Sequence, residues 1–365
     1  MARLVPEAGG EEPARESVSG GRQRPPGTRD AYGGVVWPIG GNEAHVGPRF
    51  DLSVTPGGYA WWYCDAISED GKHSLTIIAF LGSVFSPYYA WSGRKDPLNH
   101  CSINVALYGP VGAKRWANNR WAMTERRKPS VEVEERHLRI GPSSLSWDGN
   151  ALTIEINETS APVPMPVKGK VRIIPDAVTR QIFALDGAGH HRWWPVAPAA
   201  HVEVELNNPG LSWSGRGYFD TNDGEEPLED SFDKWDWSRA SLKSGAAVLY
   251  DVTRIDGERM SLALRFDGKG DVEAFEPPPS VKLPTTLWRV ERQTQADGRD
   301  ARVVRTMEDT PFYARSELET HVLGERAEAV HESLSLARFK SHWVKVLLPF
   351  RMPRTLPIGA SAAAH

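Results

Sequence analysis

The chain has 365 residues, of which 40% are hydrophobic and 25% charged, and its formal net charge is -4. This balance is typical of a globular protein and excludes nucleic-acid binding through overall positive charge. No apolar run reaches the ~18–20 residues of a membrane-spanning helix, and the first residues lack the apolar core of a signal peptide. We therefore expect a cytoplasmic protein that is long enough for two domains and has no nucleic-acid partner.

Both ends of the chain have the composition of tails. Residues 1–31 are rich in Gly, Pro, Arg and Glu and poor in large apolar side chains. Such a segment does not bury enough surface to offset the entropy lost on ordering, so we predict a disordered N-terminal tail. We expect residues 357–365 to form a flexible C-terminal tail.

Apolar and polar residues then alternate with a period of two, which is the pattern of half-buried strands. The clearest runs are residues 61–65, 152–157, 202–206 and 260–266. Asp-Gly pairs between such runs favour tight hairpins at 70–71, 256–257, 267–268 and 297–298. We predict an all-β chain of two antiparallel barrels or barrel-like sandwiches with few helices, divided between residues 223 and 239.

Several familiar catalytic motifs are missing from the sequence. There is no phosphate-binding loop, no complete dinucleotide fingerprint, no His-Glu-x-x-His and no Gly-x-Ser-x-Gly. The adjacent His190 and His191 would point to opposite faces of a strand, and Cys64 and Cys101 have no zinc-binding spacing. We predict no metal site and no cofactor, and we expect the cysteines to be buried and inert.

The densest group of polar and aromatic residues lies between residues 215 and 239. On an extended strand Tyr218 and Asp220 share one face, and Asn222 follows on that face. A carboxyl group enclosed by aromatic rings loses solvation, which raises its pKa and favours the protonated form. Asp220 is therefore a candidate general acid, although it would equally serve to cap a turn at the end of a strand.

Aromatic residues surround this segment. Trp235 and Trp237 share one strand face, and so do His191 and Trp193 if that segment is extended. Desolvated aromatic faces stabilise a cation by roughly 2 kcal/mol or more, which suits protonation of an electron-rich apolar substrate. The alternative is that these rings simply fill the core of a barrel.

The run Gly-x-Gly-Tyr-x-Asp-x-Asn-x-Gly-x-Glu-Pro-Leu-Glu, followed by Phe-x-x-Trp-x-Trp-Ser-Arg, resembles the acyclic carotenoid 1,2-hydratases, also called hydroxyneurosporene synthases. Residues 58–63, 83–88 and 348–354 are similar to the same family. The resemblance implies two lipocalin-like domains, over residues 32–225 and 226–356. It also implies cofactor-independent addition of water to the terminal C1–C2 double bond of acyclic carotenoids such as neurosporene and lycopene.

The resemblance also assigns roles to residues. The acid of the family falls on Asp220, the motif tyrosine on Tyr218, and an upstream His-x-Trp on His191 and Trp193. Our hypothesis is that Asp220 protonates C2 and that Trp193 and Tyr218 face the tertiary cation at C1. Water oriented by His191 or by the new carboxylate then captures the cation. We expect the substrate to contact four further residues, Tyr63, Asn222, Trp235 and Trp237.

An insoluble polyene substrate implies contact with a membrane. After residue 332 the chain has no acidic residue, and its basic residues are interspersed with aromatic and aliphatic ones: Arg338, Lys340, Lys345, Arg351 and Arg354. This composition suits a peripheral site on the inner or photosynthetic membrane, but it also fits a final barrel strand with solvated cations.

Three other functions fit the same residues. One is a non-catalytic lipocalin-like carrier that holds a polyene unchanged. Another is a carbohydrate-active protein that pairs Asp220 with Glu225 or Glu226. The third is a different cation-type reaction on another terpenoid.

Overall fold

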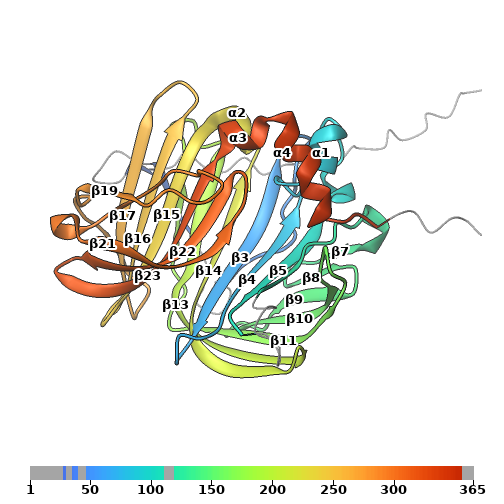
Figure 1. Ribbon diagram of the computed structural model, residues 1–365, viewed down its shortest axis with the longest axis horizontal. Helices are drawn as coiled ribbons and strands as arrows, with labels where there is room; N and C mark the ends of the chain where they lie inside the picture. The colour runs from blue at the N-terminus through green and yellow to red at the C-terminus, as the bar shows by residue number, and fades with distance from the viewer. Residues whose placement is uncertain (1–27, 30–34, 40–46, 111–118, 356–365) are drawn as a thin grey trace, which may run out of the picture.

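The computed structural model describes residues 28–29, 35–39, 47–110 and 119–355. In this part of the chain strands dominate and the α-helices have six residues or fewer, which confirms the all-β prediction (Figure 1). The predicted tails, residues 1–31 and 357–365, lie outside the described residues except for residues 28–29.

A fourteen-stranded antiparallel sheet contains the first part of the chain. Its main path is β6-β5-β4-β3-β14-β13-β11-β10-β9-β8-β7, while β12 pairs with β13 and β2, and β2 pairs with β1. The strands are β1 (Thr28–Arg29), β2 (Val35–Pro38), β3 (Tyr59–Ser68), β4 (Ser74–Leu81), β5 (Ser102–Tyr108), β6 (Asn119–Ala122), β7 (Val131–Val133), β8 (His137–Ile140), β9 (Ser143–Trp147), β10 (Leu152–Thr159), β11 (Pro166–Pro175), β12 (Gln181–Ala184), β13 (His191–Asn208) and β14 (Leu211–Gly224).

A seven-stranded antiparallel sheet in the order β18-β17-β16-β15-β23-β22-β21 follows, beside a two-stranded sheet of β19 and β20. These strands are β15 (Phe232–Leu242), β16 (Gly245–Arg254), β17 (Arg259–Asp267), β18 (Val272–Ala274), β19 (Ser280–Leu283), β20 (Arg292–Gln295), β21 (Ala301–Asp309), β22 (Tyr313–Val322) and β23 (Glu325–Ser335). The chain passes from the larger sheet to the smaller one through α2 (Leu228–Ser231).

Three of the four predicted Asp-Gly turns form hairpins. The Asp-Gly pairs at 70–71, 256–257 and 267–268 each join two strands that pair with one another. The pair at 297–298 does not form a hairpin, because it lies in the 3-10 helix η4 (Asp297–Arg299) between β20 and β21, which belong to different sheets. A turn sequence specifies a local bend, whereas the partner of the next strand depends on the apolar face that it buries.

Strands β3, β4 and β5 are buried on both faces. Trp62 and Cys64 of β3 point into a core enclosed by the larger sheet, while Trp61 and Tyr63 point into a second core shared with the smaller sheet. Strand β10, by contrast, buries Leu152 and its alternate neighbours and exposes the residues between them, as the period predicts. The functional features described below lie in the second core, between the facing sheets.

Short helices gather along one edge of the two sheets, at the top of Figure 1: α1 (Pro87–Trp91), α2, α3 (Leu336–Lys340) and α4 (His342–Leu347). Two further 3-10 turns, η2 (Pro97–Asn99) and η3 (Lys128–Ser130), lie in the first part of the chain, and η5 (Leu348–Phe350) follows α4. The basic segment after residue 335 is therefore helical and does not form a final barrel strand. None of the helices in the described residues is long and apolar enough to cross a membrane.

Candidate active site

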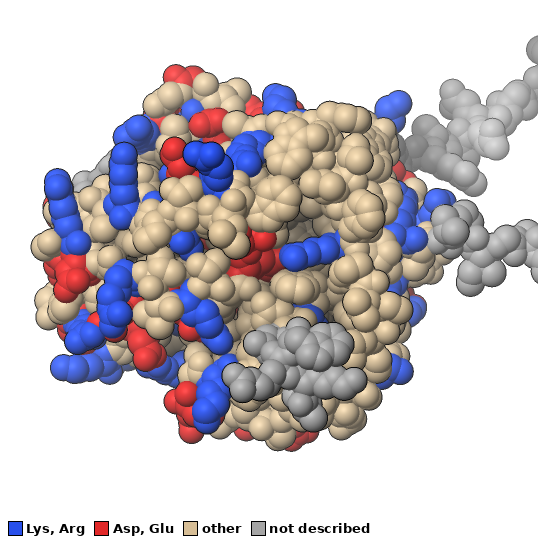
Figure 2. Space-filling model, viewed as in Figure 1, with Lys and Arg blue, Asp and Glu red and all other residues tan. Residues whose placement is uncertain are grey.

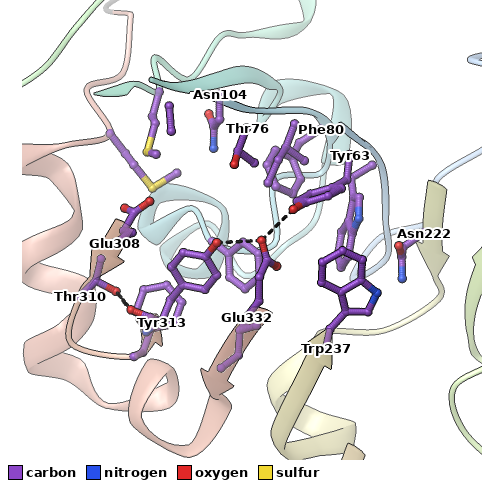
Figure 3. A pocket seen from close by; sticks show the side chains of 18 of the residues that line it. Tyr63, Thr76, Phe80, Asn104, Asn222, Trp237, Glu308, Thr310, Tyr313 and Glu332 are labelled. Carbon is purple, nitrogen blue, oxygen red and sulfur yellow. Dashed lines mark hydrogen bonds between the residues drawn. The ribbon is translucent and has the colours of Figure 1, made fainter. Parts of the chain in front are cut away.

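A cavity lies between the two facing sheets. Its empty volume is about 1090 Å³, including the part open to solvent, and Figure 2 shows it as a hollow with acidic side chains inside. One wall comes from β3, β4, β5 and β14 and the other from β15, β16 and β21 to β23 (Figure 3). Aromatic side chains form much of the lining: Trp61, Tyr63, Phe80, Phe85, Tyr108, Trp235, Trp237, Tyr250, Phe312 and Tyr313. The cavity therefore suits a flat, apolar ligand.

Strand alternation brings most of the predicted site residues to this cavity. Asp220 and Asn222 of β14 line it from the larger sheet, together with Tyr63 of β3, the register partner of Asp220. Trp235 and Trp237 of β15 line it from the smaller sheet. The sequence placed each pair on one strand face, and the packing of the two sheets turns these faces toward each other.

Asp220 is a buried acid of the cavity, with only 5% of the residue exposed. Its Oδ2 accepts hydrogen bonds from the Tyr218 hydroxyl at 2.8 Å and from the Trp193 indole Nε1 at 3.0 Å. Its Oδ1 is buried and has no hydrogen-bond partner among the described residues. Burial raises the pKa of Asp220 well above its ordinary value, and the two hydrogen bonds only partly oppose this effect. The surroundings thus favour the protonated form of Asp220, and one of its oxygens has no hydrogen-bond partner among the described residues.

Local backbone irregularity sets the direction of this side chain. Pairing between β13 and β14 shifts twice, and Asp220 lies opposite the first shift, where Pro195 and Val196 have no register partner. A proline has no N–H to donate to the ladder, and a bulge redirects nearby side chains. On the other edge of β14, a Cβ atom at Gly215 would lie 2.0 Å from the carbonyl oxygen of Ile67. Glycine therefore permits the close approach of β14 to β3.

Two predicted residues lie behind the acid and outside the cavity lining. Trp193 and Tyr218 are fully buried, and both contact Asp220 through hydrogen bonds. The Tyr218 ring also packs against Trp237, with ring centroids 5.1 Å apart. Their geometry fits the positioning of Asp220 better than direct contact with a cation, which the sequence hypothesis assigned to them.

His191 lies further from the cavity. Its Nδ1 is 3.0 Å from the Tyr59 hydroxyl, its Nε2 is 3.5 Å from a carboxylate oxygen of Glu226, and its ring packs against Phe232. Gly224 is the register partner of His191, and a Cβ at Gly224 would lie 2.8 Å from His191 Nδ1. The contact between His191 and Tyr59 therefore also depends on a motif glycine. Burial lowers the pKa of His191. The described contacts do not join His191 to Asp220.

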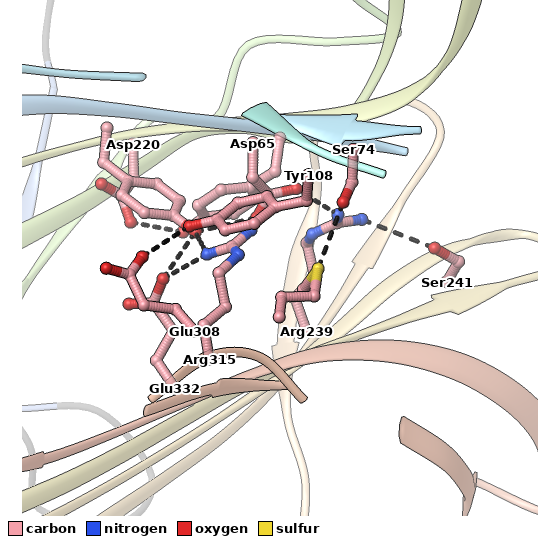
Figure 4. A network of polar contacts seen from close by, with 12 residues as sticks. Asp65, Ser74, Tyr108, Asp220, Arg239, Ser241, Glu308, Arg315 and Glu332 are labelled. Atoms are coloured by element: carbon pink, nitrogen blue, oxygen red, sulfur yellow. Dashed lines mark hydrogen bonds and ion pairs between the residues drawn. The ribbon is translucent and has the colours of Figure 1, made fainter. Parts of the chain in front are cut away.

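An ionic network that the sequence interpretation missed joins the two walls of the cavity (Figure 4). Glu332 of β23 forms an ion pair with Arg315, and its Oε1 accepts hydrogen bonds from Tyr63 and Tyr313, each at 2.9 Å. Asp65 continues the network, with its Oδ2 3.1 Å from the Tyr63 hydroxyl. The second cation of the network is Arg239, whose Nη2 lies 2.6 Å from Asp65 Oδ1.

The charges of this network balance. The carboxylates of Asp65 and Glu332 face the guanidinium groups of Arg239 and Arg315. Asp220 forms no ion pair with any basic side chain among the described residues, and the Glu332 charge raises its pKa further. An uncompensated buried charge is costly, so the neutral form of Asp220 is the one that the surroundings favour.

Comparisons with known proteins agree with this geometry. The chain matches the family model described as carotenoid hydratase CrtC over residues 77–359. It is 57% identical to the acyclic carotenoid 1,2-hydratase of Thiocapsa roseopersicina, over 93% of this chain and 83% of that protein. The acyclic carotenoid 1,2-hydratase of Rubrivivax gelatinosus is 49% identical, over 96% of this chain and 87% of that protein. The chain belongs to the carotenoid hydratase family.

The family resemblance predicted from the motif is therefore confirmed. A solved structure of an AttH protein from Nitrosomonas europaea has a TM-score of 0.52 and 15% identity, over 80% of this chain and 100% of that chain. This likeness concerns the fold alone and supports the lipocalin-like, all-β fold class. The curated relatives at 57% and 49% identity carry the assignment to the hydratases, which are hydro-lyases.

In this carotenoid hydratase family member, the carboxylate pairs proposed for sugar chemistry are not formed in the cavity. Glu225 forms an ion pair with Arg192, and Glu226 contacts Ser231 and the histidines; neither glutamate lines the cavity with Asp220. Both cysteines are free and buried, as expected. The described residues contain no group of three or more His, Cys, Asp or Glu that would hold a metal ion.

The place of Glu332 in the alternation of its strand would have marked it as a candidate site residue. On β23 it shares a face with Val330 and Leu334, both of which belong to the core between the sheets. A carboxylate in the apolar phase of a strand must be compensated or functional, because burying an isolated charge is unfavourable. Its partner Arg315 on β22 is even more buried, with 1% of its surface exposed.

Proposed function

We propose that the protein adds water across the terminal C1–C2 double bond of acyclic carotenoids, such as neurosporene and lycopene, to give 1-hydroxy carotenoids without a cofactor. One observation carries this proposal: Asp220 lines an aromatic cavity as a buried acid whose pKa is raised by burial and whose Oδ1 has no hydrogen-bond partner among the described residues. Membership of the carotenoid hydratase family supplies the class of substrate.

The first step is proton transfer. Asp220 gives its proton from Oδ1 to C2, the electron pair of the double bond forms the new C–H bond, and a tertiary cation remains at C1. Trp193 and Tyr218 act as positioning residues, because their donors hold Oδ2 and so direct Oδ1 away from them. They also stabilise the carboxylate that forms when the proton leaves.

The second step is capture of the cation by water. Aromatic rings of the cavity face the cationic end of the substrate. Trp237 and Tyr63 contact the Tyr218 ring, and Tyr250 is the register partner of Trp237. Such faces stabilise a desolvated cation by roughly 2 kcal/mol or more. The water oxygen bonds to C1 and one water proton is released, so that the product is a tertiary alcohol.

The test is incubation of purified protein with lycopene in detergent or liposomes, in H₂¹⁸O and without added cofactor, followed by mass spectrometry. We expect a product heavier by one labelled water, and Asp220→Asn to reduce its formation by about 100-fold or more. A matched control is Asp236→Asn, which removes a buried acid that does not line the cavity. Unchanged substrate across several acyclic carotenoids would favour a polyene carrier or another terpenoid reaction.

We propose further that the protein works at the cytoplasmic face of the inner or photosynthetic membrane, which it contacts through an apolar rim. The rim is defined by six exposed side chains near the helical edge: Leu287, Trp288, Trp343, Val346, Leu347 and Phe350. Trp288 and Trp343 stack with ring centroids 6.4 Å apart. The neighbouring Leu348, Arg351 and Met352 line the cavity, so the rim borders the route by which an apolar substrate would enter.

The basic residues of this segment contribute less than the sequence indicated. Four of them form ion pairs within the chain: Lys340 with Asp230, Lys345 with Glu229, Arg351 with Glu308, and Arg354 with Glu125. We therefore expect binding to depend on insertion of apolar side chains and to change little with salt or with anionic lipid.

A flotation assay with phosphatidylcholine vesicles, with and without anionic lipid, tests this surface. The double variant Trp343→Ser/Phe350→Ser should lose at least tenfold in vesicle binding, because it removes two of the large rim side chains. Val304→Ser, which removes an exposed apolar side chain on β21, is the matched control and should bind normally. Absence of vesicle binding by the unaltered protein would contradict the proposal.

A further inference from the structure

Hydration needs a group that binds the water and accepts its proton, and the cavity lining offers few carboxyl groups for this role. Asp220 is the acid, and the other two carboxyl groups in the lining are Glu308 and Glu332. Glu308 has both oxygens engaged: Oε2 accepts from the Tyr108 hydroxyl at 2.7 Å and Oε1 from Arg351 at 3.0 Å. A carboxylate so occupied has little capacity left for a water molecule.

Glu332 has a different arrangement. All of its hydrogen bonds from the described residues, those of Tyr63, Tyr313 and Arg315, converge on Oε1. Its Oε2 accepts none, and 13% of the side chain is exposed where it lines the cavity. Figure 3 shows Tyr313 and Tyr63 on either side of the carboxylate, both bonded to the same oxygen. Three donors hold the group in place while one oxygen stays open.

The position of Glu332 relative to the acid is equally specific. Asp220 projects from the larger sheet and Glu332 from the smaller one, and Tyr63 links the two walls. Tyr63 is the register partner of Asp220, and its hydroxyl donates to Glu332. A substrate end between the sheets would therefore have a neutral acid on one side and an ionised carboxylate on the other.

We propose that Glu332 is the second catalytic carboxyl group, whose Oε2 binds the nucleophilic water and takes its proton as the C1–O bond forms. This inference rests on the proposed hydration and assigns its second step. When the water oxygen donates an electron pair to C1, one O–H bond breaks and the proton passes to Glu332. Glu332 then releases the proton to solvent and Asp220 takes one up, so a turnover consumes one water and no net proton.

The charge on Arg315 explains how a buried glutamate serves as a base. Burial by itself raises the pKa of Glu332, and the adjacent guanidinium opposes that rise. The pKa of Glu332 is thus higher than that of a free carboxyl group, while the ion pair with Arg315 favours the charged form that a general base needs. His191, the base favoured by the sequence, does not line the cavity.

The experiment separates formation of the cation from its capture. Without the base, a cation made by Asp220 loses a proton again and returns to the alkene, so substrate recovered from D₂O gains deuterium without being hydrated. We expect Glu332→Gln to lose about 100-fold or more in hydration while this exchange continues, and Asp220→Asn to lose both. Glu158→Gln, which breaks a buried pair with Arg126 outside the cavity, is the matched control and should hydrate within about threefold of the unaltered protein.

A second variant tests whether loss of activity comes from misfolding caused by an unpaired Arg315. Glu332→Gln leaves Arg315 less well compensated, so Glu332→Gln/Arg315→Gln removes both charges of the pair, and it should show the same loss of hydration with retained exchange. Hydration by Glu332→Gln near the unaltered rate would overturn the assignment. So would parallel loss of hydration and exchange in folded samples of both variants. If the unaltered protein does not hydrate at all, the proposed function fails instead, and the two failures are thus distinct.

Discussion

Asp220 and Tyr63 are register partners on β14 and β3, yet Asp220 is bonded only within its own sheet among the described residues, whereas Tyr63 also reaches the smaller sheet. Asp220 is held by Trp193 and Tyr218 from its own sheet, whereas the Tyr63 hydroxyl donates to Glu332 on the smaller sheet. Two neighbouring side chains thus belong to separate hydrogen-bond systems, one neutral and one ionic. The carboxylates of Asp65 and Glu332 are neutralised by Arg239 and Arg315. Asp220 takes no part in this ionic network, so it is able to stay uncharged beside Glu332.

Trp193 and Trp194 provide a matched pair of substitutions. The indole N–H of Trp193 donates to Asp220 Oδ2, and this bond favours the ionised acid. Trp193→Phe should therefore raise the pKa of Asp220 still further. Because the reaction needs the protonated acid, activity is present below that pKa and is lost as pH rises through it. We expect the alkaline limb of the pH–rate profile to move to higher pH, with turnover reduced about tenfold by poorer orientation.

The control for this change is Trp194→Phe. Trp194 follows Trp193 on β13 and therefore points to the other face, where its N–H donates to Thr179 at 3.0 Å. This variant should lose some stability but keep the alkaline limb in place. An identical displacement of the limb in both variants would show that the Trp193 hydrogen bond does not tune the acid.

Trp237 is predicted to stabilise the cation more than it binds the substrate. Trp237→Leu keeps an apolar contact and removes the aromatic face, so we expect a loss of about 2 kcal/mol, or roughly 30-fold, that falls mainly on kcat. Trp237→Phe should lose less because it retains a ring. Steady-state kinetics with lycopene measure kcat and KM. The control is Trp213→Leu, which alters a partly buried tryptophan packed against the core of the larger sheet. A change confined to KM would assign Trp237 to binding alone.

The sequence predicted the fold class, and which candidate site residues share a strand face, for a physical reason. Strand alternation is a local property, so the faces shared by Tyr218 and Asp220 and by Trp235 and Trp237 follow from residue spacing. The packing of one sheet against the other is not local, and it places the cavity between residues of the two sheets. The alternation therefore indicated which residues share a strand face, but not which residues of the other sheet lie across the cavity from them.

Glu332 and Arg315 show what spacing leaves out. They are register partners on β23 and β22, but their joint contact with Tyr63 of β3 brings together residues 269 positions apart. Likewise, the sequence placed His191 and Trp193 on one face, whereas packing puts Trp193 against Asp220 and His191 against Tyr59 and Phe232. Roles that depend on contacts between sheets required the structure.

The motif glycine at position 215 should be essential for stability. A Cβ there would lie 2.0 Å from the Ile67 carbonyl oxygen, and backbone atoms do not yield as a flexible side chain does. We expect Gly215→Ala to lower the free energy of unfolding by about 1–3 kcal/mol, measured by urea denaturation. Gly268→Ala, where a Cβ meets nothing within 4 Å, should change it by less than about 0.5 kcal/mol. Equal effects at both positions would contradict the close approach of β14 and β3.

Asp220 should also reduce the stability of the folded protein as pH rises. Its pKa is higher in the folded state than in the unfolded chain, so below the unfolded value of about 3.9 both states hold the proton and the group has no net effect. As pH increases toward the folded pKa, the unfolded chain loses the proton while the folded protein retains it, and unfolding becomes more favourable. Asp220→Asn removes this penalty, so the variant should gain stability relative to the unaltered protein as pH rises from about 4 to about 8.

Asp256→Asn offers a comparison of opposite sign. Asp256 lies in an exposed turn, where the backbone N–H of Glu258 lowers its pKa, so its carboxylate stabilises the folded state above the unfolded pKa and that contribution is lost at low pH. Asn keeps the turn geometry and removes the charge. Urea denaturation at several pH values should therefore show Asp220→Asn diverging upward and Asp256→Asn slightly downward as pH increases. A stability difference for Asp220→Asn that does not change with pH would mean that Asp220 titrates alike in both states, and the neutral buried acid would have to be abandoned.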